Sequence, residues 1–165
     1  MLITGFMGAG KTTVAAALAA RLACRMIDLD QFITERLGRS PQSIIDESSE
    51  AEFRRLETGA LVEALQDAEA RVIALGGGTW TIEQNRALVK EAGGLSIWLD
   101  APFELCWQRI KEAGDARPLA RWRTEAQSLF DARRVLYETA AMRVQVDEER
   151  SADEIAAEIA RALLQ

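Results

Sequence analysis

Residues 5–12 read Gly5-Phe6-Met7-Gly8-Ala9-Gly10-Lys11-Thr12, which matches the phosphate-binding loop pattern G-x-x-x-x-G-K-[ST] at every fixed position. The glycines let successive backbone N–H groups curl around a phosphate, where a bulky Cβ would block the approach. Lys11 supplies a point charge for the outer phosphates, and the Thr12 hydroxyl is placed to ligate Mg²⁺. The helix that follows directs the positive end of its dipole at the same anion. The sequence therefore predicts binding of a nucleoside triphosphate.

Length and composition predict one compact domain over residues 1–165, because 48% hydrophobic residues suffice for a sizeable core. A net charge of −6 without a basic cluster argues against nucleic acid or an anionic membrane as the main partner. We find no signal peptide and no apolar run of membrane-spanning length, so we expect a cytoplasmic protein. We also expect a monomer. The short first strand leaves open whether the natural chain begins earlier.

Two residue types limit the available chemistry. Cys24 and Cys106 are isolated thiols without metal-ligand spacing, and we interpret them as buried small hydrophobes in a reducing compartment. A disulfide between them is the minor alternative. The chain has no histidine, so any general base at neutral pH must be a carboxylate or another unusual group.

Strand and helix patterns alternate along the chain, as a parallel α/β sheet requires. The five predicted strands span residues 2–4, 25–28, 71–75, 95–99 and 142–146. Because such strands are covered by helices on both faces, the predicted fold class is α/β, a three-layer αβα sandwich with a five-stranded parallel sheet.

Helix signals and breaks fall between these strands. A long amphipathic helix runs from about Glu50 to Ala68, after a break at 38–41. Pro102 suits the first turn of a later helix. Two capping boxes are predicted, one at Thr124-x-x-Gln127 and one at Ser151-x-x-Glu154, where the latter opens a helix with Ile155, Ile159 and Leu163 on one face. The polar residues 111–123 are interpreted as a mobile loop.

Asp28 and Asp30 end the second strand, at the edge where ligands bind in an open α/β sheet. Alternation along a strand places both carboxylates on the same side. One can serve Mg²⁺ and the other can reach an acceptor hydroxyl. The alternative is a pair of solvated carboxylates capping the next helix. We favour the metal and acceptor roles, since phosphoryl transfer needs an acidic group near the metal.

Three further features point to a small anionic acceptor. Arg54 and Glu57 share one helix face at i, i+3, although a surface ion pair is the simpler explanation. Gly76–Gly78 ends a buried strand and exposes backbone N–H groups at the binding edge, although it can equally be a simple turn. Arg133 precedes Leu136-Tyr137 on a helix and, taken alone, is a solvated arginine.

Taken together, these fragments resemble the shikimate kinase family across essentially the whole chain. The motifs that carry the resemblance, in order, are Gly5–Thr12, Asp28-Leu29-Asp30, Phe53-Arg54-Arg55-Leu56-Glu57, Gly76-Gly77-Gly78, Arg117-Pro118-Leu119 and Arg133-x-x-Leu136-Tyr137. The resemblance implies a P-loop NTPase fold of the nucleoside-monophosphate-kinase type. It also implies transfer of the γ-phosphoryl group of ATP to the 3-hydroxyl of shikimate, on the route to chorismate and aromatic amino acids.

The resemblance also implies roles for individual residues. Lys11, Asp30 and Arg117 would be catalytic, with Asp30 as base or orienter and Arg117 delivered by a lid at 111–123. Glu57 would hold Arg54 in position, and Thr12 and Asp28 would lie on the Mg²⁺ side. ATP would be bound by Gly8, Ala9, Gly10, Lys11, Thr12, Thr13, Arg109 and Arg117. Shikimate would be bound by Asp30, Arg54, Gly76, Gly77, Gly78 and Arg133, with the two arginines on its carboxylate.

Two departures from the family pattern concern the acceptor. Ile45 stands where the family usually has an aromatic residue against the acceptor ring, and Trp80 is bulkier than the usual occupant. Both can reshape the acceptor pocket or can belong to ordinary core packing. A related P-loop kinase for another hydroxy acid such as gluconate, or for a nucleotide, therefore stays open. A regulatory module that binds ATP without transfer is the alternative from a different class.

Overall fold

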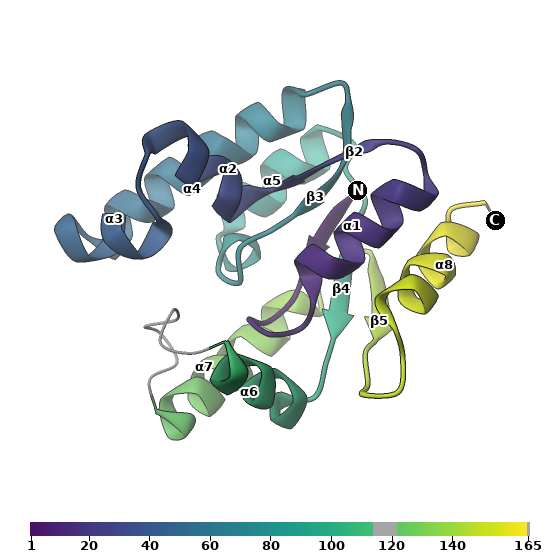
Figure 1. Ribbon diagram of the computed structural model, residues 1–165. Helices are drawn as coiled ribbons and strands as arrows, with labels where there is room; N and C mark the ends of the chain where they lie inside the picture. The colour runs from purple at the N-terminus through teal and green to yellow at the C-terminus, as the bar shows by residue number, and fades with distance from the viewer. Residues whose placement is uncertain (114–121, 165) are drawn as a thin grey trace.

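A five-stranded parallel sheet forms the centre of the protein, as a computed structural model of residues 1–113 and 122–164 shows (Figure 1). Its strand order is β2-β3-β1-β4-β5. The strands are β1 (Leu2–Thr4), β2 (Arg25–Asp28), β3 (Ala70–Ala74), β4 (Ser96–Asp100) and β5 (Met142–Gln145). The predicted five-stranded parallel sheet is confirmed. The third strand begins one residue earlier than predicted and the fourth one residue later.

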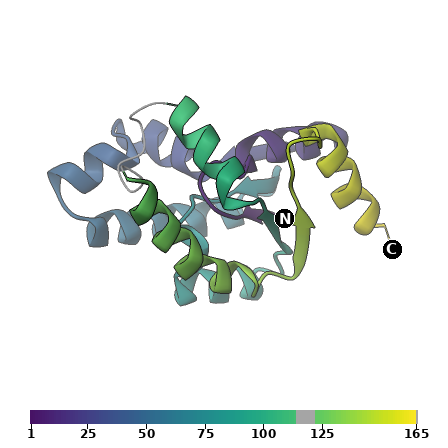
Figure 2. The ribbon, with the colours of Figure 1, turned by 90° about the horizontal axis from the view of Figure 1, so that it is seen from below.

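Helices cover both faces of this sheet. Helices α1 and α8 pack side by side on one face, whereas α5 lies on the other, and α2, α3 and α4 pack together beside β2 (Figures 1 and 2). The three predicted layers are therefore confirmed. The helical elements are α1 (Lys11–Arg21), α2 (Leu29–Leu37), α3 (Pro41–Glu47), α4 (Glu50–Gln66), the 3₁₀ turn η1 (Thr79–Thr81), α5 (Glu83–Glu91), α6 (Phe103–Glu112), α7 (Arg123–Tyr137) and α8 (Ala152–Ala162).

The core lies between the sheet and its helices. Strands β1 and β4 are buried along their whole length, which accounts for their near-continuous apolar sequences. Burying each aliphatic side chain here stabilises the fold by about 1.5–3 kcal/mol. Cys106 is fully buried, as predicted, whereas Cys24 is only partly buried and packs against the core. No helix within residues 1–113 and 122–164 is long and apolar enough to cross a membrane.

The loop between β1 and α1 needs glycine for two separate reasons. Gly8 and Gly10 have φ angles of +81° and +91°, in the left-handed region that L side chains rarely adopt. A Cβ on Gly8 would also lie 2.6 Å from the carbonyl oxygen of Cys106 in α6. The loop is therefore packed directly against the backbone of α6, which fixes its height above the sheet.

The region after α2 differs from its predicted break. Gly38 ends α2 at φ +65°, but Ser40 then accepts a 3.1 Å hydrogen bond from the N–H of Ser43 and begins a further helix. Pro41 occupies its first turn, where the missing N–H has no intrahelical role. The break is therefore only the short connection before α3, a helix that the sequence analysis missed.

Several helix ends were also predicted wrongly. Helix α4 stops at Gln66, because the Asp67 carboxylate accepts the N–H groups of Glu69 and Ala70 at 2.9 and 3.0 Å. Helix α7 begins at Arg123 without a side-chain cap, so the predicted Thr124 capping box does not form. Pro102 is the N-cap of α6 rather than a first-turn residue.

The Ser151 capping box does form, and the Glu154 carboxylate accepts a 2.8 Å hydrogen bond from the Ser151 N–H. Ile155 and Ile159 are buried as expected, whereas Leu163 caps the helix end and is exposed.

We predict that Ser151→Ala costs about 1 kcal/mol, because it removes the acceptor for an N-terminal N–H of α8. Thermal unfolding should then shift down by about 2–4 °C. Thr124→Ala is the matched control, since Thr124 caps no helix. A melting temperature for Ser151→Ala equal to that of Thr124→Ala would contradict this assignment.

Candidate active site

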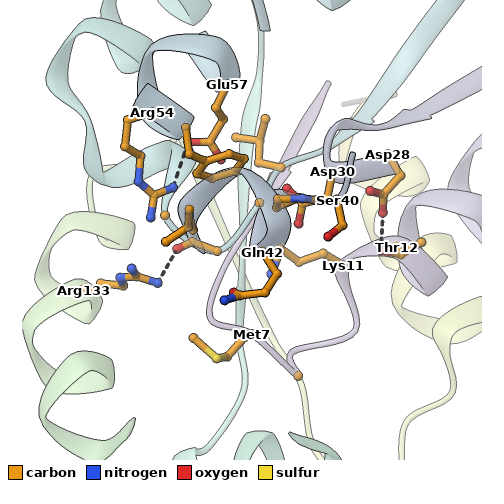
Figure 3. Close-up of a pocket in the computed structure, with 18 of the residues that line it drawn as sticks. Met7, Lys11, Thr12, Asp28, Asp30, Ser40, Gln42, Arg54, Glu57 and Arg133 are labelled. Carbon is orange, nitrogen blue, oxygen red and sulfur yellow. Dashed lines mark hydrogen bonds and ion pairs between the residues drawn. The ribbon is translucent and has the colours of Figure 1, made fainter. Parts of the chain in front are cut away.

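A cleft of about 640 Å³ opens at the carboxyl end of the sheet, between the glycine loop, α3, α4 and α7 (Figure 3). Strand order places the loop after β1 next to the ends of β2 and β3, so residues far apart in sequence converge there. The predicted site residues that line this cleft are Gly8, Gly10, Lys11, Thr12, Thr13, Asp28, Asp30, Arg54, Gly76, Gly77, Gly78 and Arg133.

The phosphate-loop side of the cleft combines a cation with oxygen ligands. The Lys11 ammonium donates to the carbonyls of Gly5 and Phe6 at 3.0 and 2.9 Å, which folds the side chain over its own loop. The Thr12 hydroxyl donates to the Asp28 carboxylate at 2.5 Å, and Asp28 also caps α2. Hydroxyl and carboxylate oxygens are the hard ligands that Mg²⁺ prefers.

The donor set around Asp28 fits magnesium rather than a protein-made metal cage. Within residues 1–113 and 122–164, no three His, Cys, Asp or Glu side chains gather closely enough to hold a metal by themselves. Mg²⁺ at kinase sites takes one or two protein ligands and completes its shell with phosphate oxygens and water. Thr12 and Asp28 fit that pattern.

Two carboxylates approach each other around Gly76. A Cβ at Gly76 would lie 2.8 Å from both Asp30 Oδ1 and Glu57 Oε1, so glycine is required for both side chains to reach this point. Burial, reinforced by the nearby charges of Glu57 and Asp28, raises the pKa of Asp30 to about 6, against the lowering effect of Lys11 and Arg54. Asp30 therefore exchanges a proton close to neutral pH.

Arg54 is anchored on one side by acids and on the other by backbone. Its guanidinium donates to Glu57 at 2.9 Å (Figure 3) and to Glu50 at 3.1 Å. A Cβ on Gly78 would lie only 2.4 Å from Arg54 Nη2, so the guanidinium rests against the Gly78 backbone. The predicted pairing of Arg54 with Glu57 is present. The two side chains are 19% and 1% exposed, so the pair is not the surface ion pair considered as the alternative.

Arg133 approaches the same glycine segment from α7. Its Nη1 donates to the Gly77 carbonyl at 3.2 Å, and the Tyr137 hydroxyl donates to the same oxygen. Burial raises the pKa of Tyr137 to about 12, so its hydroxyl remains a donor at neutral pH. Arg133 is 8% exposed, which excludes the solvated arginine considered from the sequence.

Two predicted ATP-binding residues in the described part of the chain do not line the cleft. Ala9 is buried in the core beneath the loop. Arg109 lies on α6 and donates to the Gly8 carbonyl of the loop at 3.2 Å, but it does not line the cleft. Arg117 and most of the predicted lid at 111–123 lie outside the described residues.

The two family departures have different outcomes. Ile45 lines the cleft from α3, in the position expected for a wall of the acceptor pocket. Trp80 is buried, and its indole N–H donates to the Thr139 hydroxyl at 3.2 Å. Trp80 therefore belongs to core packing, and Ile45 is the departure that faces the cleft.

The sequence analysis missed cleft residues on α3 and the groups behind Glu57. Ser40 and Gln42 line the cleft from the start of α3, and the Ser-Pro pair before an apolar run could have indicated this helix. Thr79 donates to Glu57 from η1 at 2.6 Å, and no local motif pointed to it.

Comparisons with known proteins agree with this geometry. A family model described as Shikimate kinase matches residues 7–164. The shikimate kinase of Geobacter sulfurreducens is 39% identical over 97% of this chain and 88% of its own length. That of Persephonella marina is 37% identical over 88% of this chain and 87% of its own length.

Solved structures show the same likeness. Shikimate kinase from Acinetobacter baumannii in complex with shikimate superposes with a TM-score of 0.91 at 32% identity, covering 99% of this chain and 91% of that one. Shikimate kinase from Aquifex aeolicus gives a TM-score of 0.84 at 32% identity, covering 99% and 96%.

We predict that Asp30→Asn raises thermal stability at pH 7.5. Because the folded state lifts the pKa of Asp30 from 3.8 to about 6, it binds more protons than the unfolded state in this interval. The contribution of Asp30 to stability therefore falls as pH rises from about 4 to 6, and the charge then costs about 1–3 kcal/mol. Melting curves should show the gain at pH 7.5 and none at pH 4, whereas an equal gain at both would contradict the charge effect.

Proposed function

The chain belongs to the shikimate kinase family, and we propose that it transfers the γ-phosphoryl group of ATP to the 3-hydroxyl of shikimate. The observation that carries this proposal is the pair Arg54 and Arg133, which meet the Gly77–Gly78 backbone in the cleft that also holds Lys11. Two planar guanidinium groups that face one space can each bind a carboxylate through two parallel hydrogen bonds, which the point charge of a lysine cannot do.

Different elements would bind the carboxylate and the hydroxyls of the acceptor. Its carboxylate would lie between Arg54 and Arg133, and its hydroxyls would face Asp30. Gly76–Gly78 would border the ring with backbone alone, since the charged groups of Asp30, Glu57 and Arg54 fill the space that side chains at Gly76 and Gly78 would need. Ile45 would form the apolar wall from α3.

The ATP tail would lie along residues 8–13, in the same cleft as Lys11 and Asp28. Mg²⁺, when bound, would supply charge neutralisation for the β- and γ-phosphates, held by Thr12 and Asp28. Arg109 would pack near the adenine, and Arg117 would stabilise the transferred phosphoryl group. The roles of these two arginines rest on the family resemblance alone.

Asp30 would orient the attacking hydroxyl and accept its proton. A pKa of about 6 places Asp30 close to the pH at which a general base is most effective. Phosphoryl transfer through a loose transition state draws most of its rate from positioning, so orientation by Asp30 is its main contribution. The whole chain would act as one monomeric kinase domain in the cytoplasm.

A coupled assay of ADP release tests the function. With Mg²⁺ and ATP present, we expect ADP formation on adding shikimate, and only background formation with gluconate or nucleoside monophosphates. Turnover of gluconate or a nucleotide in place of shikimate would assign another acceptor. ATP binding without turnover of any acceptor would favour the regulatory alternative.

A further inference from the structure

A ring of buried and part-buried polar groups beside the proposed acceptor site connects three helical elements. The Thr58 hydroxyl of α4 donates to Asn85 Oδ1 of α5 at 2.8 Å, and Asn85 Nδ2 donates to the Thr79 carbonyl of η1 at 2.9 Å. The Thr79 hydroxyl returns to α4 and donates to Glu57 at 2.6 Å. Glu57 directly precedes Thr58 in the sequence, so the hydrogen bonds and this peptide link together form a closed ring.

Burial makes this ring costly to disturb. Glu57, Thr79 and Asn85 are each 0% exposed, so none of them can exchange its partner for water. An ionised carboxylate taken out of water needs a partner on each oxygen. Glu57 has Arg54 on Oε2 and Thr79 on Oε1. Thr79 therefore fixes the rotation of the carboxylate on which Arg54 depends.

The position of Arg54 follows from this carboxylate. Arginine carries a long, flexible side chain, and holding it in one geometry requires more than one contact. On its inner side Arg54 has Glu57, the Gly78 backbone and the Phe53 ring, whose centroid lies 5.3 Å from Arg54 Cζ. Glu57 is the charged group among them, while Glu50 is mostly exposed. If the Glu57 carboxylate turned, the guanidinium would leave Gly78 and the space opposite Arg133.

We propose that Thr79, held by Asn85, is a positioning residue for recognition of the acceptor's carboxylate: its hydroxyl fixes Glu57, and Glu57 fixes Arg54. Thr79 does not line the cleft, and its hydroxyl reaches Arg54 through the Glu57 carboxylate. A β-branched side chain suits this task, because its χ1 angle is restricted before any contact is made. This inference rests on the proposed phosphorylation of shikimate.

Thr79→Val keeps the shape of the side chain and removes its donor. We expect kcat/KM for shikimate to fall about tenfold through KM, with kcat and the KM for ATP within about twofold. For an analogue with the ring and three hydroxyls of shikimate but no carboxylate, kcat/KM should fall less than about twofold, since this analogue does not bind Arg54. Thr79→Ser retains the hydroxyl and should restore most of the shikimate affinity. Steady-state kinetics on both acceptors measure these ratios.

Thr4→Val is the matched control, because the buried Thr4 hydroxyl has no hydrogen-bond partner among residues 1–113 and 122–164. Equal losses of Thr79→Val on both acceptors, or no loss on either, would overturn the positioning role. If Thr79→Val does not fold, Thr58→Val replaces it, with a loss of about threefold expected on shikimate only. Failure of the unmodified protein to phosphorylate shikimate would instead refute the proposed function.

Discussion

The central constraint on this structure is a conflict of charge at the carboxyl end of one parallel sheet. The topology brings Asp28, Asp30 and Glu57 to the place where the phosphate loop would bind a polyanion. Carboxylates that lie close together repel each other strongly where water is excluded. Lys11 and Arg54 offset part of this repulsion, yet the pKa of Asp30 still rises. Burial is the largest cause of this rise to about 6, and repulsion from Glu57 and Asp28 adds to it. In a chain without histidine, Asp30 would thereby be suited to accept a proton near neutral pH.

Charged side chains from different elements of the site contact the glycine segment 76–78 after β3. Arg54 packs on Gly78 from α4, and Arg133 bonds Gly77 from α7, so elements separated by some 80 residues are aligned on one short stretch of backbone. Asp30 and Glu57 meet across Gly76. Any side chain at Gly76 or Gly78 would displace a charged group, so the segment serves as a template for the proposed acceptor site.

Much of this site follows from sequence because its motifs are local. The phosphate loop and the Arg54–Glu57 pair are fixed by short spacings. The strand alternation assumed for Asp28 and Asp30 was wrong, because β2 ends at Asp28 and Asp30 lies in the first turn of α2. Helix α3 was not predicted, because a helix of seven residues is too short to show a clear helical periodicity of apolar residues. The ring through Thr79 and Asn85 joins positions 22, 6 and 27 residues apart, so only the folded structure brings them together. Trp80 shows the reverse case, in which a bulky residue beside a motif belongs to the core.

A crystal structure with shikimate, ADP and Mg²⁺ bound together tests the charge arrangement most directly. We predict the shikimate carboxylate between the guanidinium groups of Arg54 and Arg133, with a ring hydroxyl against the Asp30 carboxylate. The ADP phosphates should lie along the loop at Lys11. A carboxylate bound at Lys11, or a ring whose hydroxyls face away from Asp30, would contradict this arrangement.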